Sequence, residues 1–124
     1  MRIAHFTLAT RELRRTCSFF QEVFGWRPLQ RTASAPAPVA WLEIVPGQEV
    51  HLIELPDFEA SAFEREYGRH IAVTYPADGF SALKERLRAH GAEPAAPERE
   101  PLAERFFFRD PNGYLFEVVP EMKS

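Results

Sequence analysis

The feature that most constrains this 124-residue sequence is an internal repeat. His5 and His70 each stand in a short apolar segment, and they are 65 residues apart. His51 and Glu117 stand in later apolar segments, and they are 66 residues apart. Scattered polar residues would not be expected to keep this register, and self-similarity at a fixed spacing is a fold-level signal. The repeat therefore predicts a fold of two related modules.

Each later segment also follows a glycine turn at the same distance. His51 comes four residues after Gly47, and Glu117 comes four residues after Gly113. Pro46-Gly47 and the Asp-Pro-Asn-Gly sequence that ends at Gly113 are both strong turn formers. We therefore expect His51 and Glu117 to occupy equivalent positions on the last strand of each module.

Hydrophobic periodicity predicts the element order β-α-β-β-β in the first module. Strands are expected over residues 3–8, 27–32, 40–45 and 49–55. A helix capped by Thr10 and ended by Gly25 is expected to bury a stripe made of Leu13, Cys17, Phe20 and Phe24. Cys17 is the single cysteine, and its place in this stripe favours an inert, buried thiol over a nucleophile.

The second module repeats the pattern. Strands are expected over residues 70–75, 106–109 and 114–119, with a Pro-rich loop over 94–101. A helix capped by Asp78 should bury Phe80, Leu83 and Leu87. We expect one α+β domain over 1–124, in which modules 1–56 and 69–124 are joined by a connector, 57–68, with one helical turn. The two βαβββ modules should pair into a cupped mixed sheet with the helices outside.

Such a pairing would let one donor from each first strand and one from each last strand converge in a cavity. The predicted metal ligands are His5, His51, His70 and Glu117. Imidazole and carboxylate suit a divalent ion such as Zn, Ni, Co, Mn or Fe. Two open octahedral positions could bind neighbouring oxygens of a substrate, and Glu117 is the candidate catalytic base.

His51 and Glu54 compete for one place in this set. Side chains alternate along a strand, so two residues three positions apart lie on opposite faces. We expect His51 to face the cavity because it is in register with Glu117, and Glu54 to face solvent or a helix end. If Glu54 faced the cavity in place of His51, the metal ligands would be two histidines and two glutamates.

Four segments resemble the vicinal oxygen chelate superfamily, which contains glyoxalase I, methylmalonyl-CoA epimerase, extradiol dioxygenases, and fosfomycin and bleomycin resistance proteins. They are AHFTLAT with FFQEVFGW, EVHLIEL, GRHIAVTYPADGFSALKERLRAHGA and FFFRDPNGYLFEVVP. The resemblance covers nearly the whole chain. It implies a metal-dependent lyase, isomerase or dioxygenase with ligands at the positions of His5, His51, His70 and Glu117, and a homodimer.

One position departs from the pattern and leaves alternatives open. Glyoxalase I and the epimerase carry Glu or Gln where this chain has His51, so a second base is missing. The subset His5, His70 and Glu117 would instead resemble the triad of iron-dependent dioxygenases or of fosfomycin-modifying transferases, with His51 beside it as an acid or base. A metal-free binding protein similar to the bleomycin resistance proteins is the alternative from another class.

Composition excludes other classes of partner. The net charge of −3 is spread along the chain, so nucleic acid is not expected. No apolar stretch approaches the roughly 20 residues of a membrane span. With a single cysteine, we expect a cytoplasmic protein that acts on a small molecule.

Overall fold

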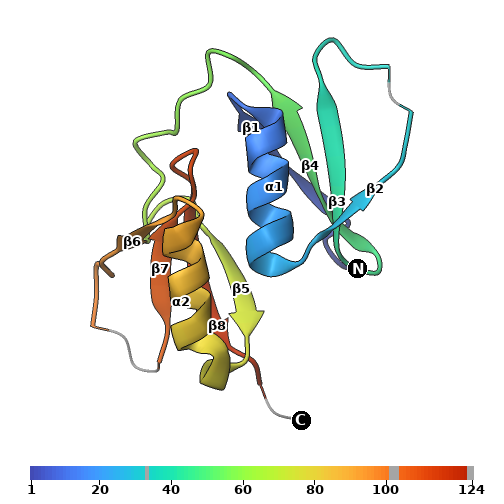
Figure 1. Cartoon of the computed structure of the whole chain (residues 1–124). Helices are drawn as coiled ribbons and strands as arrows, with labels where there is room; N and C mark the ends of the chain where they lie inside the picture. Colours follow the sequence, from blue (N-terminus) through green and yellow to red (C-terminus); the bar gives the residue numbers. More distant parts are fainter. Residues whose placement is uncertain (33, 101–103, 123–124) are drawn as a thin grey trace. The chain divides into compact units, whose positions relative to one another are not determined.

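The structure is a computed structural model that describes residues 1–32, 34–100 and 104–122. The chain divides into two compact units, Met1–Phe58 and Glu59–Ser124 (Figure 1). Unit 1 contains β1 (His5–Thr10), α1 (Leu13–Phe24), β2 (Arg27–Leu29), β3 (Val39–Val45) and β4 (Gln48–Glu54). Unit 2 contains β5 (Ile71–Tyr75), a 3-10 turn (Ala77–Gly79), α2 (Phe80–Ala89), β6 (Glu93–Ala95), β7 (Phe106–Arg109) and β8 (Leu115–Pro120). The expected α+β class and the two βαβββ modules are confirmed.

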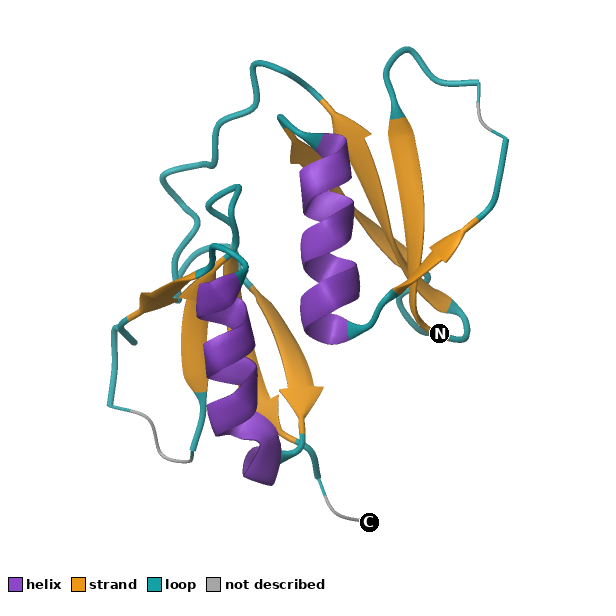
Figure 2. Ribbon diagram, viewed as in Figure 1, coloured by secondary structure: helices purple, strands orange, loops and turns teal. Residues whose placement is uncertain are grey.

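The two modules build their sheets in the same way. Unit 1 has the strand order β1-β4-β3-β2, and unit 2 has the order β5-β8-β7-β6. In each, the first strand runs parallel to the last, and the remaining pairs are antiparallel. A single helix lies over one face of each sheet (Figure 2). The repeat seen in the sequence is therefore a repeat of topology.

The strand register is also the same in both units. His51 on β4 stands opposite Thr7 on β1, and Glu117 on β8 stands opposite Ala72 on β5. Gly47 and Gly113 adopt φ of 88° and 93°, the left-handed region that glycine enters without a steric penalty. The two turns lead into β4 and β8 and place His51 and Glu117 at equivalent positions in the register, as their spacing predicts.

Helix α1 begins later than its sequence suggests. Its N-cap is Glu12 rather than Thr10, and the Leu13 N–H donates to Oε2 of Glu54 at 2.9 Å. The Thr10 hydroxyl accepts from the Glu12 N–H and shares a 2.7 Å hydrogen bond with the Thr16 hydroxyl. The prediction of Thr10 as the N-cap was wrong, because the carboxylate of Glu54, distant in sequence, accepts the hydrogen bond at the start of α1.

The buried stripe of α1 is also shifted. Its buried residues are Thr16, Phe19, Phe20 and Val23, which pack with Leu42, Val50 and Leu52 of the sheet core. Leu13, Cys17 and Phe24 are half-buried. Burial raises the pKa of the Cys17 thiol, which keeps it from acting as a thiolate.

The helix of unit 2 follows the predicted stripe. Phe80, Leu83 and Leu87 are all buried. Asp78 lies in the 3-10 turn before α2, and the N-cap is Gly79 without a side-chain cap. The expected loop over 94–101 begins inside β6, which pairs with β7; residues 101–103 lie outside the described part of the chain.

The connector contains turns and no helical turn among its residues, all of which are described. It packs on unit 2 through two buried acids. Glu64 accepts from both Arg69 nitrogens, at 2.7 and 2.6 Å, and from the Leu115 N–H at 2.7 Å. Arg109 donates to the carbonyls of Glu64 and Gly113. Arg69 and Arg109 thus hold the connector against unit 2. No helix within the described residues has the length and apolarity needed to span a membrane.

Candidate functional site

Two of the four predicted ligands lie together on the open face of the unit 1 sheet. Val50 and Leu52 point to the helix side, so His51 between them points to the other face. There its ring stacks on His5, with centroids 3.8 Å apart and an interplanar angle of 13°. The donors from the first and last strands of this unit are thus adjacent.

A carboxylate and a guanidinium hold the ring of His51. Its Nε2 lies 2.9 Å from Oε1 of Glu49. Arg31 donates to both oxygens of Glu49 at 2.7 Å, and this bond, with that of His51, lowers the pKa of Glu49 to about 2. Trp41 meets the His51 ring edge-on and lies under the Arg31 guanidinium. Glu49 is therefore ionised near neutral pH and orients His51.

The other two predicted ligands meet in unit 2. Nε2 of His70 lies 3.2 Å from Oε1 of Glu117. The side chain of Glu117 is only 9% exposed and that of His70 24%. Nδ1 of His70 is buried and has no hydrogen-bond partner among the described residues. One nitrogen of His70 therefore lies beside the Glu117 carboxylate, and the other is buried without a partner among the described residues, an exception in a native structure that calls for an explanation.

Arg105 fixes the other oxygen of Glu117. Its Nη1 donates to Oε2 at 2.5 Å, and its side chain is 12% exposed. Nη2 of Arg105 reaches Glu66, which also accepts from Arg99 and from the Glu98 N–H. The connector thus supplies a second anion to Arg105. The pairing leaves Oε1 as the atom of Glu117 that faces His70.

The two units share this arrangement of residue types. In unit 2, Phe107 meets the His70 ring edge-on at 5.8 Å, and Arg105 lies over the Phe107 ring at 5.5 Å. Phe107 stands opposite Glu117 in the sheet, as Trp41 stands opposite His51. Each unit therefore surrounds its imidazole and its carboxylate with one aromatic ring and one arginine.

Glu54 lies away from this face. Its carboxylate caps α1, so it sits at a helix end as expected. Its negative charge there also complements the helix dipole. Glu54 consequently has a local structural role, and His51 is the β4 residue that lies beside His5.

The donor pair in unit 2 fits a divalent ion. Ligands about 2.1 Å from a metal at adjacent octahedral positions are about 3.0 Å apart, close to the 3.2 Å between His70 Nε2 and Glu117 Oε1. The His5 and His51 rings fit less directly, because lone pairs in nearly parallel planes do not meet at one point. Within either unit, the described residues hold no group of three His, Cys, Asp or Glu side chains that could bind a metal ion.

Sequence reasoning missed Arg31, Glu49, Glu66 and Arg105. One signal was available: alternation places Glu49 on the same face of its strand as His51. No comparable signal existed for Arg105, because its position just before β7 has no periodic pattern. Nor did any pattern mark Glu66, which lies in the connector.

A family model identifies the family of this chain, and solved structures share its fold. The profile of the glyoxalase/bleomycin resistance protein/dioxygenase superfamily matches residues 2–118. A comparison with curated protein sequences found no match.

Three solved structures illustrate the likeness. A mutant of the fosfomycin resistance protein FosX from Listeria monocytogenes, complexed with Mn(II) and 1S,2S-dihydroxypropylphosphonic acid, is 24% identical with a TM-score of 0.80, over 98% of this chain and 92% of that one. FosX from Mesorhizobium loti is 22% identical with a TM-score of 0.74, over 94% and 89%. A glyoxylase/bleomycin resistance protein/dioxygenase domain from Frankia sp. EAN1pec is 22% identical with a TM-score of 0.77, over 100% and 94%. At these identities the likeness establishes the fold alone.

Proposed function

Because the chain belongs to the glyoxalase/bleomycin resistance protein/dioxygenase superfamily, we propose that it is a divalent-metal-dependent enzyme acting on a small oxygenated substrate. The observation that carries the proposal is the His70–Glu117 pair, a nitrogen and an oxygen donor 3.2 Å apart on a half-buried face. Unit 1 offers His5 and His51 from the equivalent strands. Both the donor chemistry and its repetition favour a metal over an ordinary hydrogen bond.

His5, His70 and Glu117 would hold the metal, and His51 completes the site. In the observed geometry His51 bonds to Glu49, so it serves as a fourth ligand only if its ring turns away from that carboxylate. Zn, Ni, Co, Mn and Fe all suit nitrogen and carboxylate donors. Mn(II) is the first ion to test, since the Listeria FosX structure contains it.

A bound divalent ion would polarise two neighbouring substrate oxygens and stabilise negative charge that develops on them. Arg105 holds Oε2 of Glu117 and so presents Oε1. Glu49 holds Nε2 of His51, which keeps that imidazole beside His5, where a proton can be taken or given. Glu117 would act as a base only after one of its carboxylate oxygens has separated from Arg105 or from the metal. Lyase, isomerase and dioxygenase reactions share this chelation, and oxygen consumption separates the last from the others.

A homodimer is part of the proposal. β1 and β5 are edge strands, each paired on one side only within its sheet. Phe63 and Tyr67 in the connector are 76% and 69% exposed. Open strand edges and exposed aromatic rings are surfaces that a second subunit commonly covers. We also propose a cytoplasmic location, because a single cysteine suits a reducing compartment.

A metal-free small-molecule binding protein is the second candidate. It is favoured by one observation: Glu117 and His51 already have protein partners, Arg105 and Glu49. In that case the aromatic rings of Trp41 and Phe107 would serve as walls for a ligand. The two candidates make opposite predictions about metal content.

Elemental analysis of untagged protein purified without added metal tests the proposal. We expect a stoichiometric divalent ion, or a saturable one on titration with Mn(II). Incubation of the loaded protein with fosfomycin, followed by NMR, then asks whether a diol forms as found in the Listeria structure. If the protein takes up no divalent ion until the ion concentration is high enough for nonspecific binding, the metal-free candidate is favoured.

A further inference from the structure

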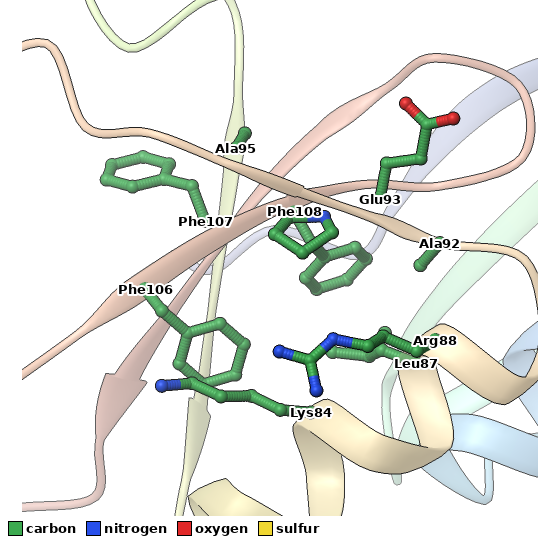
Figure 3. A pocket seen from close by; sticks show the side chains of 10 residues that line it. Lys84, Leu87, Arg88, Ala92, Glu93, Ala95, Phe106, Phe107 and Phe108 are labelled. Atoms are coloured by element: carbon green, nitrogen blue, oxygen red, sulfur yellow. The ribbon is translucent and has the colours of Figure 1, made fainter.

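Unit 2 contains a cavity on the side of its sheet opposite Glu117. It lies between α2 and strands β6 and β7 and has a volume of about 170 Å³ (Figure 3). Phe106 and Phe108 line it, and they stand opposite Val118 and Phe116, whose side chains alternate with that of Glu117. None of the four candidate metal ligands lines the cavity, although Phe107, whose ring meets that of His70, is among its lining residues.

The floor of this cavity is apolar and aromatic. Leu87, Ala92 and Phe108 are buried, and Phe106 closes one side. An apolar cavity of about 150 Å³ is known to hold one benzene molecule. Aromatic walls favour edge-to-face or offset contacts with another ring. In size and lining the cavity fits one six-membered aromatic ring.

The rim carries two cations from one face of α2. Lys84 and Arg88 are four residues apart, the spacing at which helical side chains are neighbours. The Lys84 ammonium lies over the Phe106 ring at 4.8 Å, and neither cation forms an ion pair with a described residue. Figure 3 shows both cationic groups on the same side of the cavity and the Glu93 carboxylate directed away from them. Two neighbouring like charges repel, and an anion between them would remove that cost.

We propose that this cavity binds a small aromatic carboxylate. The ring would lie against Phe106 and Phe108, and the carboxylate would accept charge-assisted hydrogen bonds from Lys84 and Arg88. Because none of the four candidate metal ligands takes part, binding is independent of metal. Its failure would therefore leave the proposed enzymatic function untouched.

The probe is benzoate, titrated into the full-length protein and followed by proton–nitrogen NMR. We expect saturable shifts centred on the amides of Leu87, Ala92 and Phe108, with a dissociation constant on the order of millimolar for so small a ligand. Benzyl alcohol, which keeps the ring and removes the charge, should bind at least about tenfold more weakly. Shifts that do not saturate, or equal binding of the alcohol, would overturn the proposal.

A pair of double variants completes the test. Lys84→Met with Arg88→Met keeps the apolar stems, removes both charges and should weaken benzoate binding by about tenfold or more. Arg14→Met with Arg15→Met makes the same change in net charge on the exposed face of α1 and should leave binding unchanged. The spectra themselves report whether each variant is folded. An equal loss in both double variants would assign the effect to net charge and reject the site.

Discussion

The rings of His5 and His51 are stacked, with centroids 3.8 Å apart and planes 13° apart. They come from parallel neighbouring strands, and Glu49 holds one of them through Nε2. The two rings lie in separate, nearly parallel planes, so the lone pairs of their nitrogens do not point at one ion. The stacking therefore favours different roles for the two histidines. In the proposed site His5 would bind the metal, while Glu49 holds the ring of His51 beside it.

Removing either first-strand histidine should abolish tight metal binding. His5→Ala and His70→Ala each delete one ligand of the proposed set, and the remaining ligands do not fix the coordination geometry. Inductively coupled plasma analysis after dialysis measures the result. His90→Ala, at the exposed C-cap of α2, is the matched control and should retain the metal. Full metal content in either ligand variant would refute the site.

His51 and Glu54 should respond in opposite ways. His51→Ala is expected to lower metal affinity or turnover by about 10–100-fold, the usual effect of a lost group around a metal. Glu54→Gln should leave both unchanged and should lower the free energy of unfolding by about 0.5–1 kcal/mol, since it removes charge from the start of α1. Metal titration and urea unfolding separate the two. A metal defect in Glu54→Gln would mean that Glu54, not His51, belongs to the site.

Glu117→Gln should reduce turnover at saturating metal by about 100-fold or more if the carboxylate takes a proton during the reaction. The amide keeps one oxygen that can bind the metal and loses the second oxygen, which accepts from Arg105, so metal binding should persist, although more weakly. Isothermal titration calorimetry measures metal binding, and a turnover assay measures catalysis. A fully active Glu117→Gln variant would exclude the role of base and leave only that of ligand.

Asp110 should make stability fall as the pH rises. Its Oδ1 accepts from the Asn112 and Tyr114 N–H groups, and burial raises its pKa to about 6. In an unfolded chain that pKa is about 4, so the folded state holds the extra proton between the two values. The stability that Asp110 contributes is present below about pH 4 and is lost as the pH passes about 6, by up to about 3 kcal/mol.

Asp110→Asn tests this, because it keeps the oxygen that accepts both N–H groups. Urea unfolding at about pH 4.5 and about pH 7.5 should show the variant gaining relative to the wild type at the higher pH. The variant Asp57→Asn, at an exposed position, should have the same free energy of unfolding as the wild type at both pH values. Parallel curves for the wild type and Asp110→Asn would show that Asp110 is ionised across the range.

Mixing inactive variants tells whether a site is completed within one chain or between two copies. If unit 1 of one subunit works with unit 2 of its partner, refolding His5→Ala together with His70→Ala restores one intact site in each mixed dimer, about a quarter of all sites. If each chain builds its own site, no activity returns. Light scattering on the wild type checks the dimer, and a monomer at micromolar concentration would count against it.

The module order, the strand register and the positions of His5, His51, His70 and Glu117 could all be read from the sequence. They depend on local rules: side chains alternate along strands, apolar stripes mark helices, and Gly47 and Gly113 allow the turns that start β4 and β8. Because both modules follow these rules, the pattern in one module supports the elements predicted for the other. Within the strands, these rules also place His51 and Glu54 on opposite faces.

Only the tertiary structure decided which charges hold those donors. Arg105 reaches Glu117 across 12 residues, Arg31 reaches Glu49 across 18, and Glu54 caps a helix that begins 41 residues earlier. Thr10 failed as a cap, and Glu64 and Glu66 of the connector are buried, for the same reason. A long, flexible charged side chain carries no periodic signal, and its partner is set by which distant backbone the fold brings within hydrogen-bond reach.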